Sequence, residues 1–439
     1  MALALPFAGV ERRSGWLRGS LLAACLLGLL ASAPAWVNSH GFPLLPLARW
    51  FPIVPSPWDR CWFAAMLLAL VLAAWFYRVG VGCFLALTFL AFCEDQNRGQ
   101  PWIYLYWMLL ALTLFPAPTA FAACRLAMSV VYLWSGVQKC NARFFEIEPA
   151  WFTAPAAHWG LPDVVREALR WGVAAAPFLE MGIGVAVWIA PLRRWAIGGV
   201  VLLHAFALLI LGPLGYNYNW VVWPWNLAMP ALIVVLFTEE KFWRKPTTAP
   251  AVTIVPQTNA TAQKPSRRVK PADAKARANP AHPAPTGPRL PQALAGLRRS
   301  KLALTLTGLY ALMPVFSYFG WWDSYFSFAL YSENLANANI FVSQAFADRL
   351  PPTLRSQVQK FQANYDPEHQ GPFIFAFQAW AYQELHVPPI SEPRNFRNIF
   401  AFLRTYSTEP GDLRMVMSTR TGAVLFYQGD EREELQAWR

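Results

Sequence analysis

The sequence predicts an all-α polytopic membrane protein, a bundle of about nine transmembrane helices followed by a small C-terminal α+β domain outside the membrane. Three observations support this fold class. First, 56% of the 439 residues are hydrophobic and only 14% are charged, whereas soluble domains average about 25% charged residues. Second, the apolar residues gather in nine segments of membrane-spanning character. Third, the pattern after Trp322 is that of a small soluble domain.

The nine predicted spans are separated by polar or proline-containing segments. They cover approximately residues 17–37, 60–77, 79–93, 101–116, 121–139, 171–190, 195–213, 221–238 and 301–319. Several are shorter than the roughly 20 residues of a typical transmembrane helix. We therefore expect a compact bundle with irregular loops at its outer surface.

The distribution of basic residues predicts the orientation of the bundle. Arg12, Arg13 and Arg18 precede the first span and place the N-terminus in the cytoplasm. Segment 238–301 carries 13 Lys and Arg against 3 Asp and Glu, whereas 320–439 carries 10 against 13. Alternation of the spans places the first segment inside and the second outside, as in a multi-pass protein of the bacterial inner membrane. The net charge of +12 thus indicates a cytoplasmic loop and argues against nucleic-acid binding.

The first apolar segment also has features of a signal peptide. Basic residues precede an apolar run at 21–30 and small residues at 31–33. Pro34 directly follows the small residues and disfavours cleavage, so we expect a retained anchor. The orientation of the other spans is the same in either case.

Four regions follow from these patterns. They are a transmembrane bundle at 1–238, a basic linker at 239–300, a ninth transmembrane helix at 301–319 and the α+β domain at 320–439. Residues 246–296 are rich in Pro, Ala, Thr, Lys and Arg and contain almost no aromatic residues. Such a segment buries too little apolar surface to offset its chain entropy, so we expect it to be disordered.

The last region shows both helical and strand patterns. Helical periodicity predicts helices around 353–363, 373–385 and 393–405. Leu413–Thr419 and Ala423–Gln428, separated by a glycine-containing turn, predict a β-hairpin.

A polar stripe runs along the fifth predicted span and ends at Lys139. Its members fall within a sector of about 80° at helical spacing; they are Arg125, Ser129, Tyr132, Gly136 and Lys139, with Ser135 close beside. Unpaired polar groups in hydrocarbon cost several kcal/mol each, so the stripe should face other helices or a wet cavity. Two interpretations of Lys139 remain open: an ammonium that extends to the membrane interface, or a buried amine that acts as a base.

Glu180 and His204 are the other intramembrane ionisable residues. Each lies about nine residues into its predicted span, near the middle of the bilayer. Such residues usually pair with each other or line a functional cavity. A structural hydrogen bond between Glu180 and His204 and a proton-relaying or quinone-contacting pair are both open, and Asn226 is placed to join either network.

The sequence predicts no metal site. The six cysteines lie inside or at the ends of apolar segments, without CxxC or Cys/His ligand spacing. We expect them to pack as small core residues, with a disulfide between Cys93 and Cys140 as an open alternative. The outer segments Glu94–Asn97 and Asn217–Trp220 are expected to be hydrated helix caps.

Three segments resemble the transmembrane region shared by vitamin K-dependent gamma-carboxylase and the bacterial proteins with a horizontally transferred transmembrane (HTTM) domain. The strongest, Val131–Asn141 (VYLWSGVQKCN), is similar to the family's Tyr-x-x-(Ala/Ser)-Gly-x-x-Lys-(Leu)-(Asn/Asp) segment. The resemblance implies that Lys139 matches the lysine proposed to deprotonate reduced vitamin K. Asp95–Tyr106 and His204–Asn226 resemble two further family segments, and the resemblance covers roughly residues 10–240.

The chain also departs from the carboxylase. Where the carboxylase has an Asn-Asn-His run, this sequence has Gln100, Pro101 and Trp102, so a histidine assigned to catalysis there is missing. The predicted outer domain is much smaller than the carboxylase's lumenal region. Residues 314–334 resemble a segment that follows the last span in uncharacterised bacterial members, which implies membership of that branch without naming a substrate.

The leading hypothesis is a carboxylase- or oxidoreductase-like bundle that binds a quinone or another isoprenoid-like lipid, with Lys139 as the base. The candidate ligand-binding residues are Tyr132, Ser135, Gly136, Glu180, His204 and Asn226. The lipid bilayer and an isoprenoid quinone or lipid are the expected partners, and the resemblance implies a reduced quinone as cofactor. The alternative is a non-catalytic scaffold that acts through its C-terminal domain, where Phe373–Phe377 and Trp380 face either a partner or the core.

Overall fold

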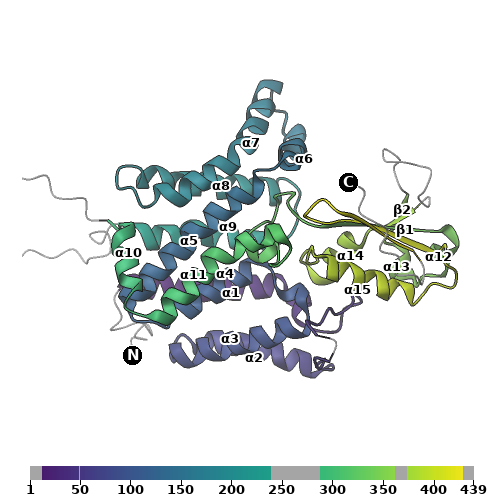
Figure 1. The fold of residues 1–439 in the computed structure, drawn as a ribbon, viewed down its shortest axis with the longest axis horizontal. Helices are drawn as coiled ribbons and strands as arrows, with labels where there is room; N and C mark the ends of the chain where they lie inside the picture. Colours follow the sequence, from purple (N-terminus) through teal and green to yellow (C-terminus); the bar gives the residue numbers. More distant parts are fainter. Residues whose placement is uncertain (1–11, 49, 239–286, 361–372, 429–439) are drawn as a thin grey trace, which may run out of the picture.

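The computed structural model describes residues 12–48, 50–238, 287–360 and 373–428. A helical bundle forms one end of the molecule, and an antiparallel sheet with its own helices forms the other (Figure 1). The bundle contains α1 (Arg12–Ala31), α2 (Trp58–Leu72), α3 (Tyr77–Glu94), α4 (Pro101–Leu112), α5 (Ala117–Lys139), α6 (Ala142–Thr153), α7 (Asp163–Ala186), α8 (Arg193–Leu211), α9 (Val222–Phe237), α10 (Leu290–Leu297) and α11 (Lys301–Phe316). The helix α10 lies at the end of the bundle farthest from the sheet.

Five of the described helices are long and apolar enough to cross a membrane: α1, α3, α5, α8 and α11 with its extension to Phe319. The helices α4 and α9 are apolar but shorter. Each of the nine predicted spans coincides with a helix, the remaining two being α2 and α7. The helical, membrane-type character of the chain is therefore as predicted, and the count of nine crossings stays a prediction.

The helix α5 is central, because it packs against α4, α7, α9, α10 and α11. Its closest neighbour is α7, and two glycines make the approach possible. A Cβ atom on Gly136 would lie 2.4 Å from the carbonyl oxygen of Pro177 in α7. One on Gly184 in α7 would lie 2.8 Å from the carbonyl oxygen of Ser129 in α5. Small residues at helix crossings allow backbones to touch in this way.

Basic side chains tie together the end of the bundle that lies away from the sheet. The guanidinium of Arg13 donates to the carbonyl oxygens of Val235 and Leu236 at 2.7 and 2.6 Å. These carbonyls belong to the last turn of α9, where backbone acceptors have no partner within the helix. The first helix is thereby fixed to the ninth.

The predicted disordered linker differs from the structure at its C-terminal end. Residues 239–286 lie outside the described part of the chain, but α10 is a helix that packs against α5. Ala293 and Leu297 are buried there, and the Thr119 hydroxyl donates to the carbonyl oxygen of Gly296 at 3.3 Å. The average composition of 246–296 conceals this short apolar segment, which becomes stable by burial against α5.

The prediction of hydrated caps at Glu94–Asn97 is wrong, because all four residues are buried. The guanidinium of Arg98 donates to Glu94 Oε2 at 2.6 Å, and Asp95 Oδ1 accepts from the backbone N–H of Leu45 at 3.2 Å. The chain before α2 and the C-terminal domain cover this end of the bundle, so hydrogen bonds within the protein replace water.

The C-terminal domain is built on a five-stranded antiparallel sheet with the order β2-β3-β1-β4-β5. Its strands are β1 (Asn337–Val342), β2 (Val358–Lys360), β3 (Phe373–Phe375), β4 (Leu413–Ser418) and β5 (Val424–Gln428). Its helices are α12 (Gln344–Arg349), α13 (Pro352–Arg355), α14 (Phe377–Leu385) and α15 (Pro393–Arg404). The β4–β5 hairpin and α15 confirm two predictions for this region.

Two helix predictions are wrong in part. The segment 353–363 holds only the short α13 before the chain enters β2, and its last three residues lie outside the described part. The segment 373–385 begins with β3, and only its second part is helical. Periodicity does not separate a strand from a helix in so short an apolar run, and pairing of β3 with β1 and β2 decides the outcome.

Three of the apolar residues of Phe373–Phe377 and Trp380 face the core, whereas Phe373 and Ile374 are half-buried. Phe375, Phe377 and Trp380 are each no more than 3% exposed. The ring of Trp380 packs against Phe42 from the chain that follows α1, with centroids 4.7 Å apart. These residues belong to the core that joins the domain to the bundle.

Polar contacts also hold the domain to the bundle. Arg394 donates to Gln96 Oε1 at 2.6 Å and to Asp323 Oδ1 at 2.7 Å. Gln138 in α5 accepts from the side-chain amide of Asn334 at 2.9 Å and also from Arg420. Because Gln138 immediately precedes Lys139, the domain is attached at the end of the helix that carries the polar stripe.

All six cysteines are free, so the alternative of a Cys93–Cys140 disulfide is not realised. Cys93 is buried and Cys140 is exposed. The prediction of core packing holds for Cys25, Cys93 and Cys124, which are buried, and is wrong for Cys61, Cys83 and Cys140, which are exposed.

The substitution Gly136→Ala should destabilise the bundle. The added methyl group would meet a backbone carbonyl, and overpacking of this kind costs about 1–3 kcal/mol, more than the gain of up to about 1 kcal/mol in helix propensity. Gly182→Ala on α7 is the matched control, because no atom lies within 4 Å of a Cβ placed there. Thermal unfolding in detergent should rank Gly136→Ala below both wild type and control; equal stabilities would contradict the close crossing.

Candidate functional site

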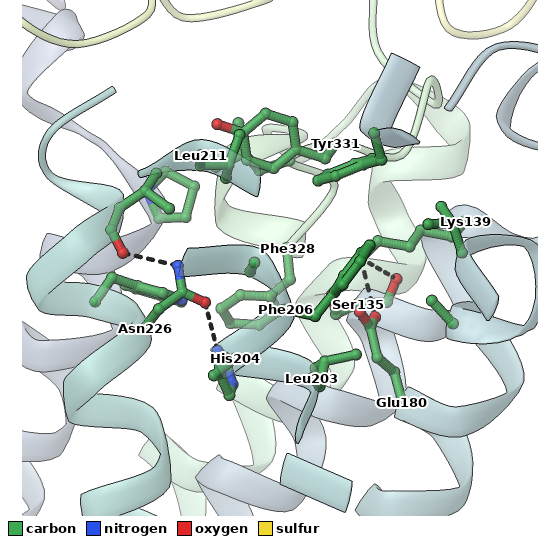
Figure 2. Close-up of a pocket in the computed structure, with 18 of the residues that line it drawn as sticks. Ser135, Lys139, Glu180, Leu203, His204, Phe206, Leu211, Asn226, Phe328 and Tyr331 are labelled. Carbon is green, nitrogen blue, oxygen red and sulfur yellow. Dashed lines mark hydrogen bonds and ion pairs between the residues drawn. The ribbon is translucent and has the colours of Figure 1, made fainter. Parts of the chain in front are cut away.

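A cavity of about 380 Å³ lies between α5, α7, α8 and α9. Its wall is mostly apolar and includes the start of α4 and part of the chain before β1. Figure 2 shows polar groups at two places on this wall. Lys139 lies with Ser135 and Glu180 on one side, and His204 lies with Asn226 on the other.

Lys139 is buried inside the bundle, and its side chain is 9% exposed. Its Nζ donates to Glu180 Oε2 at 2.9 Å, to Ser135 Oγ at 2.7 Å and to the carbonyl oxygen of Ser135 at 3.2 Å. An ammonium has three N–H donors, and all three have acceptors here. The structure therefore excludes an extended lysine that reaches the membrane interface, and it supplies a carboxylate partner that the stripe alone did not predict.

His204 is held by hydrogen bonds on both ring nitrogens. Tyr132 Oη lies 2.8 Å from Nε2, and Asn226 Oδ1 lies 2.6 Å from Nδ1. The amide nitrogen of Asn226 donates to the carbonyl oxygen of Val222 at 2.7 Å, which fixes the orientation of the amide. Asn226 Oδ1 is then an acceptor, so the proton of a neutral His204 is on Nδ1 and the Tyr132 hydroxyl donates to Nε2.

Five of the seven predicted site residues line the cavity: Ser135, Lys139, Glu180, His204 and Asn226. Tyr132 and Gly136 are not part of the wall. Tyr132 lies behind His204 and orients it, while Gly136 provides the close crossing of α5 and α7. The predicted polar stripe thus faces other helices and the cavity, but its members have different tasks.

A direct hydrogen bond between Glu180 and His204 is not formed. Each residue pairs with α5 instead, Glu180 with Lys139 and His204 with Tyr132. The reason is the close crossing at Gly136, which turns the face of α7 that carries Glu180 towards α5. The depth of a residue in the bilayer did not reveal which helix lies opposite it.

Sequence analysis missed the residues that close the cavity on the side of the C-terminal domain. Phe328 and Tyr331, from the chain before β1, line the wall together with Asn219. Tyr331 stacks on Trp151 with ring centroids 5.8 Å apart, and Asn219 Nδ2 lies 3.3 Å from its hydroxyl oxygen. The sequence shows that these segments are rich in aromatic residues, but only the fold brings the segments together at the cavity.

Exposed residues of α7 and α8 line the cavity, which indicates an opening between these two helices. Leu179 and Leu202 line the cavity and are 44% and 71% exposed. Exposed leucines on helices of this length and composition are expected to contact lipid. A ligand with an apolar chain therefore has a lateral opening through which that chain leaves the cavity.

Comparisons with protein-family models, curated protein sequences and solved structures found no match for this chain. Within the described residues, no three His, Cys, Asp or Glu side chains gather in an arrangement able to hold a metal ion.

Removing one charge of the Lys139–Glu180 pair should be much worse than removing both. Glu180→Gln leaves a buried ammonium without its counter-charge, at a cost of about 3–5 kcal/mol. The double variant Lys139→Met/Glu180→Gln should recover most of that loss. Thermal or denaturant unfolding in detergent measures the cycle.

The surface pair Arg143–Glu333 supplies the control cycle. Its atoms are 3.1 Å apart, but the side chains are 47% and 27% exposed. Exposed pairs couple by about 0–1 kcal/mol. Additive losses at Lys139 and Glu180, or equal coupling in the two cycles, would contradict a buried ion pair.

Proposed function

We propose that this protein binds an isoprenoid-type lipid with a hydroxylated ring, such as a reduced quinone, and removes a proton from it with Lys139. The observation that carries the proposal is the buried Lys139–Glu180 pair on the wall of an apolar cavity that opens between α7 and α8. The apolar wall suits the ring, and the lateral opening suits the chain.

The ion pair acts as one proton-accepting unit. In the unliganded site Lys139 is an ammonium that neutralises Glu180, with Ser135 satisfying its other donors. When a ligand hydroxyl enters, the ammonium gives a proton to the carboxylate, and the resulting amine takes the proton of the hydroxyl. The new oxyanion then lies beside an ammonium in a low-dielectric site, which stabilises it.

His204 and Asn226 have a positioning role in this proposal. The hydrogen-bond chain from Tyr132 through His204 and Asn226 ends on the carbonyl oxygen of Val222. A backbone carbonyl passes no proton onward, so the chain holds the wall in place and is not a relay. The sequence left two roles open for His204, contact with the quinone and relay of protons. The present proposal keeps only the first, in which His204 positions the ligand.

The resemblance to the carboxylase and HTTM proteins supports the choice of Lys139 and of a reduced quinone. It does not extend to carboxylation of glutamate. Trp102 stands at the place of the carboxylase's catalytic histidine, and its buried indole packs against Trp36 with ring centroids 6.4 Å apart. An indole cannot take the place of a histidine as an acid or base, so that catalytic role of the carboxylase has no counterpart at this position.

We propose a multi-pass arrangement with the N-terminus in the cytoplasm and the C-terminal domain outside. Basic residues gather at the end of the bundle opposite the sheet, among them Arg13 and Arg193, which bind backbone carbonyls there. Exposed tryptophans occur near both ends, as Trp75 and Trp195 beside the basic residues and Trp321 near the sheet. Both features support this orientation.

Native mass spectrometry of gently solubilised protein tests the binding proposal. Wild type should carry a quinone or other isoprenoid lipid, or take up an added short-chain naphthoquinol. Ala207→Phe places a ring in the cavity wall and should lower occupancy on the order of tenfold. Ala205→Phe is the control, because Ala205 lies on the exposed face of α8.

Two results together would overturn the proposal. One is wild-type protein without bound lipid or affinity for the naphthoquinol. The other is Lys139→Ala with unchanged stability and ligand content.

The alternative, a non-catalytic scaffold that acts through the C-terminal domain, needs a different experiment. Because Phe328, Tyr331 and Val387 line the cavity, deleting 325–439 would open the site as well as remove the domain. Substitution of Lys139 leaves the domain in place, so loss of function in Lys139→Ala would favour the site and retention would favour the scaffold.

A further inference from the structure

Glu148 is a buried carboxyl group that the proposed chemistry does not yet use. It is 5% exposed, and its Oε2 has no hydrogen-bond partner among the described residues. An unpartnered buried carboxyl oxygen is costly, which calls for an explanation. It lies in α6, which begins three residues after Lys139.

The helical spacing places Glu148 on the cavity side of α6. Phe144 and Phe152 both line the cavity, and they lie four residues before and four residues after Glu148. Residues at this spacing share one helix face. Glu148 therefore lies on the side of α6 that faces the cavity, between two rings that line it, and is not itself a lining residue.

The charged neighbours of Glu148 lie on two sides. Burial raises the pKa of the Glu148 carboxyl to about 7, with Glu333 adding to the rise and Lys139 opposing it. Glu333 is partly exposed and pairs with Arg143 at 3.1 Å. At neutral pH both the acid and the carboxylate forms of Glu148 are thus populated, between the buried pair and the surface.

Besides Glu333 and Lys139, the described titratable groups near Glu148 on other elements are tyrosines or residues that are already paired. Tyr216, Tyr218 and Tyr331 each interact electrostatically with Glu148. The charged residues in the first part of α7, which packs against α6, pair with one another: Asp163 with Arg166 and Glu167 with Arg170. The remaining acid of α7, Glu180, is engaged by Lys139.

We propose that Glu148 is the group through which protons pass between the Lys139–Glu180 pair and the surface at Glu333. This rests on the proposed function. After the ligand O–H bond breaks, the pair holds one proton more than before, as ammonium and carboxylic acid. The carboxylate of Glu148 takes that proton and gives it to water on the side of Glu333, which restores the ion pair. One proton leaves for each ligand deprotonated, and no electron is transferred.

Infrared difference spectroscopy of the detergent-solubilised protein tests the titration. The carbonyl band of a protonated carboxylic acid should disappear with a midpoint near pH 7 and be missing in Glu148→Gln. Glu146→Gln, an exposed acid on the same helix, is the control and should leave the band unchanged. Absence of a titrating band that Glu148→Gln removes would overturn the assignment.

Glu333 and Lys139 should shift the titration midpoint of Glu148 in opposite directions. Glu333→Gln removes a negative charge and should lower the midpoint. The double variant Lys139→Met/Glu180→Gln, which avoids an unpaired buried charge, removes the positive charge of Lys139 and should raise it. A midpoint that moves in neither variant would overturn the placement of Glu148 between the two groups.

Proton release on mixing with the short-chain naphthoquinol separates this inference from the proposed function. Glu148→Gln should slow release on the order of a hundredfold while leaving probe binding unchanged. If the probe binds and release from Glu148→Gln is as fast as from wild type, the inference fails and the proposed function stands. If Glu148 titrates with both couplings but no probe binds, the proposed function fails and the proton site stands.

Discussion

The close crossing of α5 and α7 is the constraint on which the site depends. With glycine at 136 and 184, the two backbones approach so closely that a Cβ atom at either position would overlap a carbonyl group of the other helix. This approach brings Glu180 within 2.9 Å of Lys139. Larger residues would separate the helices, leave two unpaired charges in an apolar bundle and remove one wall of the cavity.

The cavity has two sets of polar groups, which differ in charge. Lys139 and Glu180 form a buried ion pair, which the proposed function uses to accept and return a proton. Tyr132, His204 and Asn226 form a chain of neutral groups with a fixed direction that ends on the backbone. The first arrangement is suited to proton transfer, and the second to holding a wall in shape.

The C-terminal domain and the bundle form one functional unit. Phe328 and Tyr331 close the cavity, Trp380 packs on Phe42, and Gln138 binds the domain beside Lys139. Tyr216, Tyr218 and Tyr331, which lie near Glu148, come from the chain between α8 and α9 and from the chain before β1. The proposed route for protons towards the domain side would require that bundle and domain are assembled.

The sequence by itself determined the helical, membrane-type bundle, the small α+β domain, the β4–β5 hairpin and the polar face that ends at Lys139. These features depend on composition and on local periodicity, which report what each segment buries. It did not determine that Glu180 pairs with Lys139 instead of His204, or that Glu94–Asn97 and Glu148 are buried. Periodicity identifies the face of a helix but not the helix opposite it, and that choice was made by the tertiary packing of α5 against α7 and of the domain against the bundle.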